Sequence, residues 1–181
     1  MTAFDLVIRN GMVVTATDRM DCDIGVSGGK IVALGKMLGG GAEEIDAAGR
    51  LVLPGGIDSH VHIEQQSSMG IETADDFYSG SVAAAFGGTT TMIPFAVQER
   101  GRALRASIND YHALARPKSV IDYAFHLIIL DPNEQVLGQE LPALIKDGYT
   151  SFKVYMTYAR LRVKDYQLLS VLALAREHGA M

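Results

Sequence analysis

The sequence has 181 residues, of which 48% are hydrophobic and 20% are charged, a balance typical of a globular protein with a substantial core. Its formal net charge of −5 and the scattered positions of Lys and Arg argue against nucleic acid or an anionic membrane as a partner. No segment has the apolar length that crosses a bilayer, and residues 1–5 do not resemble a signal peptide. The single cysteine, Cys22, fits a reducing compartment, so we expect a cytoplasmic protein that acts on small molecules.

Residues 1–53 are expected to form a first domain, a small antiparallel β-sandwich layer. Short aliphatic runs alternate there with turn residues, as in a β-rich domain. Asn10 and Gly11 predict a two-residue hairpin, because both central positions of such a turn take positive φ. Gly28 and Gly29 follow Ser27 and predict another turn.

Residues 54–181 are expected to form a second domain, in which strands alternate with helices. This alternation is the signature of parallel βα units. Strands are predicted at 57–63, 89–97, 121–130 and 151–158, each followed by a helical stretch, and the last helix is expected to bury Leu168, Leu172 and Ala175. The predicted fold class is therefore α/β, a partial TIM-like (β/α) barrel of about four of the eight units in a complete barrel.

The first predicted barrel strand contains the most informative residues of the chain. Alternate residues of a strand share a face, so Asp58, His60, His62 and Glu64 are expected on one side. Two histidines flanked by carboxylates would make an expensive core, because buried ionisable groups need partners. A divalent metal ion supplies such a partner, so we expect a metal site here rather than an incidental pair of histidines.

Lys153 is the second unusual residue, because it lies within the fourth predicted strand on one face with Ser151 and Tyr155. Desolvation inside a barrel favours the neutral amine, which can take up carbon dioxide. The resulting carbamate is a two-oxygen anion that could bridge two cations. The alternative, given equal weight, is a lysine whose head reaches the barrel rim, where Glu64 is one candidate partner.

Two stretches carry a resemblance to a known family. Residues 54–62 read Pro-Gly-Gly-Ile-Asp-Ser-His-Val-His, and residues 148–158 read Gly-Tyr-Thr-Ser-Phe-Lys-Val-Tyr-Met-Thr-Tyr. Together they resemble the cyclic-amide amidohydrolases, closest to the hydantoinase and dihydropyrimidinase group. Residues 83–91 and 122–126 add to the likeness, which runs over essentially the whole chain. The resemblance implies metal-dependent hydrolysis of hydantoins or dihydropyrimidines to N-carbamoyl amino acids.

The resemblance also implies roles for individual residues. His60 and His62 would bind the more buried of two zinc ions, and carbamylated Lys153 would bridge both. Tyr158 would be a catalytic and substrate-binding residue whose hydroxyl stabilises the oxyanion, whereas its position alone suggests an ordinary strand-end residue. Asp58 would orient a ligand histidine, and a purely structural hydrogen bond is equally open for it. A homo-oligomer, specifically a tetramer, is implied as well.

The family uses two further histidines and an aspartate that have no counterpart in this sequence. We therefore expect a piece of a longer enzyme, with little or no turnover from these residues alone. His112 is expected on a helix surface, His126 in the core and His178 at a helix C-terminus, so none is assigned as a ligand. The alternative function is a non-catalytic amidohydrolase-like scaffold or assembly module.

Two positions bear on the substrate. Dihydroorotases resemble a His-x-His-x-Arg pattern whose arginine binds the substrate carboxylate, and Glu64 stands at that position here. A substrate carboxylate would meet repulsion, which favours hydantoins or dihydropyrimidines over dihydroorotate. The polar loop at residues 65–69 weakly disfavours large apolar substituents.

Overall fold

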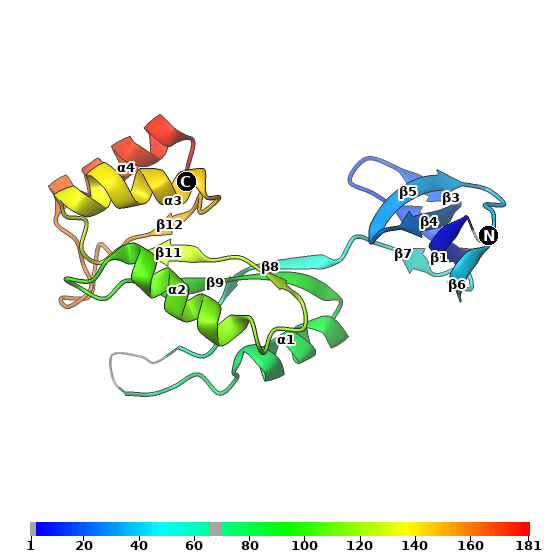
Figure 1. Cartoon of the computed structure of the whole chain (residues 1–181), viewed down its shortest axis with the longest axis horizontal. Coiled ribbons are helices and arrows are strands. Elements are labelled where there is room, and N and C mark those ends of the chain that lie inside the picture. Colours follow the sequence, from blue (N-terminus) through cyan, green and yellow to red (C-terminus); the bar gives the residue numbers. More distant parts are fainter. Residues whose placement is uncertain (1–2, 66–69) are drawn as a thin grey trace. The chain divides into compact units, whose positions relative to one another are not determined.

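The computed structural model describes residues 3–65 and 70–181, and the chain divides into two compact units, Met1–Pro54 and Gly55–Met181. Figure 1 shows strands alone in the first unit and strands that alternate with helices in the second. No helix in these described ranges is long and apolar enough to cross a membrane. Each unit is described by itself below.

The first unit consists of two small β-sheets. Its strands are β1 Phe4–Arg9, β2 Met12–Val14, β3 Arg19–Asp21, β4 Asp23–Ser27, β5 Lys30–Gly35, β6 Gly41–Asp46 and β7 Leu51–Val52. One sheet has the order β5-β4-β1-β6 and the other the order β3-β2-β7. The predicted β-layer is confirmed, with antiparallel pairs β1–β4, β4–β5 and β2–β3, although β1–β6 and β2–β7 are parallel.

The predicted hairpin at Asn10 and Gly11 is wrong. Asn10 has a positive φ of 55°, but Gly11 does not, and β1 and β2 lie in different sheets. A Cβ at Gly11 would lie 2.6 Å from Cγ2 of Val52, so the glycine is required for the close approach of β2 to β7. The turn at Gly28 and Gly29 is confirmed, since both have positive φ, 59° and 72°, and join the antiparallel β4 and β5.

The second unit is a run of parallel βα units. Its elements are β8 Gly56–Val61, α1 Phe77–Phe86, β9 Thr89–Val97, α2 Leu104–Ala115, β10 Asp122–Tyr123, β11 His126–Ile128, the π-helix η1 Val136–Glu140, α3 Leu141–Lys146, β12 Phe152–Lys153 and α4 Asp165–His178. All strand pairs are parallel: β8–β9, β9–β10, β9–β11 and β11–β12. This confirms the predicted α/β class and the partial TIM-like barrel.

The third and fourth predicted strands are shorter than expected. The ladder beside β9 is interrupted between Met92 and Phe95, where Pro94 has no N–H to donate, and the third strand splits into β10 and β11. The fourth ends at Lys153, because the chain turns back at Tyr158 and the Val163 N–H donates to the Tyr155 carbonyl at 3.0 Å. The free side of β12 pairs with the backbone of Met181.

The main core lies between the strands and the helices of this unit. Its fully buried members include Phe77 from α1, Leu104 and Ile108 from α2, Leu127 from β11 and Leu144 from α3. On α4 the predicted stripe is displaced, because the buried positions are Val171, Leu174 and Ala175, whereas Leu172 is 54% exposed. Tight packing holds the strand ends in fixed places.

Candidate functional site

Phe95, near the C-terminal end of β9, is the centre of a cluster of polar side chains. The centre of its ring lies 4.7 Å from that of His60, 4.9 Å from that of His62 and 5.0 Å from that of His126. The Nζ atom of Lys153 lies 4.3 Å from the same ring centre. The C-terminal ends of parallel strands meet at one edge of a barrel, so residues distant in the sequence come together there.

An open pocket of about 550 Å³ adjoins this ring, and His60, His126 and Lys153 contribute to its wall together with Phe95. His60 is exposed, and Lys153 is half-buried. The pocket therefore offers an imidazole and an amine on a largely apolar base. This combination of convergent polar groups in a concave site is typical of ligand-binding pockets.

The spacing of His60 and His62 fits one shared metal ion. Their ring centres are 5.5 Å apart and the rings are inclined at 63°. Two imidazoles bound to one tetrahedral zinc ion at Zn–N distances of about 2.0 Å have ring centres about 5 Å apart. Neither ring nitrogen of His60 is hydrogen-bonded to a residue that the structure describes. The pair thus fits a metal ion.

Other ligands must come from a different kind of residue or from elsewhere. Within residues 3–65 and 70–181, no group of three or more His, Cys, Asp or Glu side chains is arranged to hold a metal ion. Among the described residues of other types, Lys153 lies against the same Phe95 ring as His60 and His62. Its Nζ also lies 5.4 Å from the ring centre of Tyr155.

Glu64, the partner considered for Lys153 at the barrel rim, has other partners in the structure. The Glu64 carboxylate instead forms an ion pair with Lys118 and accepts a hydrogen bond from the Phe77 backbone N–H at 3.1 Å. The strand alternation ends before Glu64, because β8 ends at Val61 and Glu64 has a positive φ of 49°. This change of backbone conformation turns Glu64 away from the face of His60.

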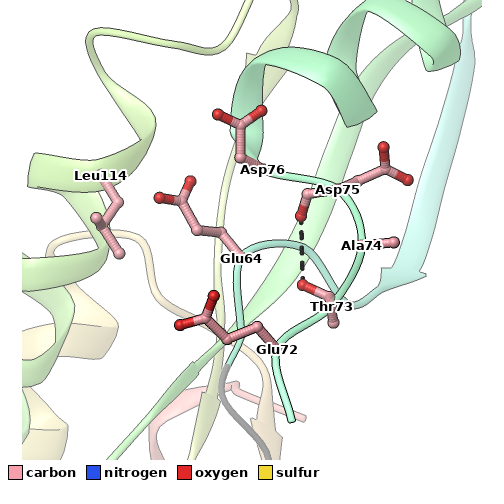
Figure 2. Close-up of a pocket in the computed structure, with 7 residues that line it drawn as sticks. All are labelled: Glu64, Glu72, Thr73, Ala74, Asp75, Asp76 and Leu114. Carbon is pink, nitrogen blue, oxygen red and sulfur yellow. Dashed lines mark hydrogen bonds between the residues drawn. The ribbon is translucent and has the colours of Figure 1, made fainter.

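Glu64 lies in a second, acidic pocket of about 420 Å³ that shares no lining residue with the first. Figure 2 shows the Glu64 carboxylate directed toward the side of Leu114, while the Asp75 carboxylate points away from it. The Lys118 ammonium lies 3.4 Å from Asp76 as well, and these two carboxylates hold the pKa of Lys118 above its ordinary value. The predicted repulsion between Glu64 and a substrate carboxylate therefore has no support in this geometry.

Tyr158 and Asp58 occupy exposed positions. Tyr158 lies in a turn with a positive φ of 62°, its side chain is 69% exposed, and its ring meets that of Tyr155 edge to face at 5.9 Å. The backbone N–H groups of Leu161 and Arg162 donate to its carbonyl at 2.8 and 2.9 Å. The Asp58 Oδ1 atom accepts a hydrogen bond from the His60 backbone N–H at 3.1 Å, so it contacts the backbone and not the imidazole.

His126 uses both ring nitrogens within the protein. Nδ1 lies 2.5 Å from the Ser151 Oγ, and Nε2 lies 2.8 Å from the Ser59 carbonyl oxygen. These bonds leave no nitrogen for a metal ion. The ring is half-buried and lines the pocket, so the core position predicted for His126 is not observed.

The surface position predicted for His112 is wrong. Its ring is half-buried between Tyr149, with Nε2 2.6 Å from the hydroxyl, and Tyr123, with Nδ1 3.3 Å from the hydroxyl. Burial, assisted by the charge of Arg116, lowers the pKa of His112. His178 lies in the last turn of α4, as predicted.

Sequence reasoning missed two residues of the site, Phe95 and Gln65. Phe95 could have been found, since it stands at the C-terminal end of a correctly predicted strand, where barrel sites form. Gln65 gives no signal by its spacing, but its amide lies between the His62 ring and the Phe95 carbonyl. The remainder of the predicted polar loop, residues 66–69, lies outside the described residues.

Comparison with known proteins identifies relatives over nearly the whole chain. The model of the amidohydrolase family matches residues 51–181. D-hydantoinases from Rhizobium radiobacter and Geobacillus stearothermophilus are 43% and 46% identical over 178 residues, which are 98% and 97% of this chain. The chain spans only 38% and 37% of the length of these curated relatives.

Solved structures agree with the sequence matches. A D-hydantoinase structure aligns with a TM-score of 0.92 at 43% identity and covers 98% of this chain and 38% of its own. A crystal structure of dihydropyrimidinase from Brevibacillus agri aligns with a TM-score of 0.90 at 43% identity and covers 96% of this chain and 38% of its own. The similarity extends over both units.

Proposed function

Because the chain belongs to the amidohydrolase family, among its hydantoinases and dihydropyrimidinases, we propose that it supplies part of a cyclic amidohydrolase. The reaction is hydrolysis of the ring amide of a hydantoin or dihydropyrimidine to an N-carbamoyl amino acid. The observation that supports it best is the cluster of His60, His62 and Lys153 around the ring of Phe95. In this proposal residues 1–53 form an accessory β-domain and residues 54–181 half of the catalytic barrel.

Hydantoinases of this family depend on a metal, and we infer zinc, two ions in a complete site. His60 and His62 would hold the first ion, and the neutral amine of Lys153 would add to carbon dioxide and release a proton to become a bridging carbamate. Paired metal ions lower the pKa of bound water and polarise the attacked carbonyl. Carbamylation would replace the half-buried ammonium group with an anion whose charge the metal ions would balance.

Tyr158 would act on the substrate. Its hydroxyl is positioned by a turn in which two backbone N–H groups hold its carbonyl, and it would donate a hydrogen bond to the oxygen of the attacked carbonyl. Asp58 would act indirectly, since its bond to the His60 backbone restrains the segment that carries the imidazole. The active assembly would be a cytoplasmic homo-oligomer, which we expect to be a tetramer.

The test compares the complete encoded polypeptide with the 181-residue chain for zinc content and for hydrolysis of hydantoin and dihydrouracil. The complete polypeptide should bind zinc and hydrolyse one of these rings, whereas the 181-residue chain should show little or no turnover. Tyr158→Phe should lower kcat by about 100- to 1,000-fold, the usual cost of removing one oxyanion donor. Tyr166→Phe is the matched control, because Tyr166 is 63% exposed on α4 and should leave kcat unchanged.

Three results would contradict the proposal. The complete polypeptide could bind no metal, it could bind metal and hydrolyse neither ring, or Tyr158→Phe could be as active as the control. Metal binding without hydrolysis would favour the alternative function, a non-catalytic scaffold. Efficient hydrolysis by the 181-residue chain would show that these residues suffice.

A further inference from the structure

Gln65 connects His62 to the backbone beneath Phe95. The Oε1 atom of Gln65 lies 2.6 Å from Nδ1 of His62, and its Nε2 atom donates to the Phe95 carbonyl oxygen at 2.5 Å. His62 also stacks on the Phe95 ring, with ring centres 4.9 Å apart and planes inclined by 19°. The imidazole is thus held both on its face and at one nitrogen.

The orientation of the Gln65 amide follows from its partners. A backbone carbonyl oxygen accepts hydrogen bonds and cannot donate, so the NH₂ group of the amide must face Phe95. The amide oxygen then faces His62, and an oxygen there can only accept. The hydrogen bond therefore requires the proton of His62 to be on Nδ1, which leaves the lone pair on Nε2.

The backbone of Gln65 is restrained as well. Its N–H donates to the Thr73 Oγ1 at 3.1 Å, and its carbonyl accepts from the Thr73 N–H at 3.0 Å. The preceding N–H, of Glu64, donates to the Asp75 carbonyl at 2.9 Å. The Gln65 side chain also lies beside the hydroxyl of Tyr111, a half-buried residue of α2. The amide is therefore held in place before any ligand binds.

We propose that Gln65 is a positioning residue that fixes His62 in the tautomer whose Nε2 can bind a metal ion. The inference rests on the proposed function, because it requires His62 to be a metal ligand. Hydrogen bonds from outside the coordination sphere orient ligand histidines, and their loss typically lowers metal affinity by about 10- to 100-fold. Gln65 provides such a hydrogen bond to His62, and the same side-chain amide connects His62 to the strand that contains Phe95.

The experiment measures metal affinity in the complete encoded polypeptide, by competition for zinc with a chromophoric chelator. Gln65→Met keeps the length of the side chain but has no strong acceptor for His62, and it should weaken zinc binding by about 10- to 100-fold. Gln65→Glu keeps the acceptor oxygen for His62 but has no N–H for the Phe95 carbonyl, so it should lose less affinity than Gln65→Met. Gln139→Met, on an exposed residue of η1, is the control and should bind zinc as the wild type does.

Cobalt supplies a second readout that a merely structural role would not change. The visible absorption bands of the Co²⁺-loaded protein should shift in Gln65→Met, shift less in Gln65→Glu and stay close to the wild type in the control. If Gln65→Met does not fold, Gln65→Asn replaces it, because the shorter amide cannot reach both partners. The same loss is expected from it.

The outcomes separate the two proposals. Wild-type protein that binds neither zinc nor cobalt would overturn the proposed function and this inference together. Wild-type protein that binds metal and hydrolyses its substrate, with Gln65→Met equal to it in affinity and spectrum, would overturn only the role of Gln65. An equal loss in Gln65→Glu and Gln65→Met would also overturn it, since the retained acceptor would then have no effect.

Discussion

The substitution Phe95→Leu tests whether the Phe95 ring orders the candidate site in addition to stabilising the barrel. Phe95 is 4% exposed, and its ring contacts three imidazoles and the Lys153 ammonium. Leucine retains most of the apolar burial but loses the aromatic face. Aromatic pairs contribute about 0.5–1.5 kcal/mol each, and a cation–π contact about 0.5–1 kcal/mol at an exposed site. Because three ring pairs and one cation–π contact are lost together, we expect a loss of about 2–5 kcal/mol in the free energy of unfolding.

Phe95→Leu should also weaken zinc binding, which a loss of overall stability by itself would not do. Without the ring, His60, His62 and Lys153 lose the surface on which all three rest, so their donor atoms become less ordered. A loss of about 10- to 100-fold in zinc affinity is expected, as when other outer contacts of metal ligands are removed. Urea unfolding measures the stability, and chelator competition measures the affinity.

Phe125→Leu is the matched control. Phe125 is 2% exposed and also lies among rings, those of Phe77, Tyr111, His112 and Tyr123, but none of its partners is a proposed metal ligand. It should lose a similar amount of stability and keep its zinc affinity. If Phe95→Leu binds zinc as tightly as Phe125→Leu does, the reasoning that places Phe95 under the site is refuted.

Two further predictions test the packing of the second unit. Gly55→Ala should destabilise the protein by about 1–3 kcal/mol, because a Cβ at Gly55 would lie 2.1 Å from the Thr90 Oγ1, whereas Gly56→Ala, with its nearest atom at 3.4 Å, should cost less in urea unfolding. The lowered pKa of His112 means that its contribution to stability is complete above about pH 6.5 and is lost as the pH falls through the folded-state value, so His112→Gln should flatten this part of the pH profile; an unchanged profile would count against it.

Periodicity and turn residues predicted the alternating strands and helices of the second unit. Such a prediction succeeds where the local preference of the sequence agrees with its tertiary surroundings. Residues 89–97 form β9 as predicted, and a helix, α2, follows this strand as expected. The prediction failed at Asn10 and Gly11, where the glycine serves close sheet packing instead of a hairpin. Turn chemistry identifies a bend, but which strands pair across it is decided by distant partners.

Those site residues could be predicted whose positions result from strand alternation and from the C-terminal edge of the barrel strands. His60, His62 and Lys153 were singled out by residue type and position, and the structure brings them to the ring of Phe95. Gln65 was not predictable, because its importance comes from a backbone turn after β8 and from the carbonyl of another strand. Spacing in the sequence contains no information on such a contact.

In the segment after β8, the change of backbone conformation at Glu64 gives neighbouring residues different partners. His62 and Gln65 remain with Phe95, whereas Glu64, with its positive φ, turns to the start of α1 and to Lys118. A carboxylate near the positive end of a helix and a lysine is stabilised without a metal ion. Glu64 therefore connects α1 to the segment that contains His62. The imidazoles of His60 and His62 do not depend on Glu64 and can bind a ligand.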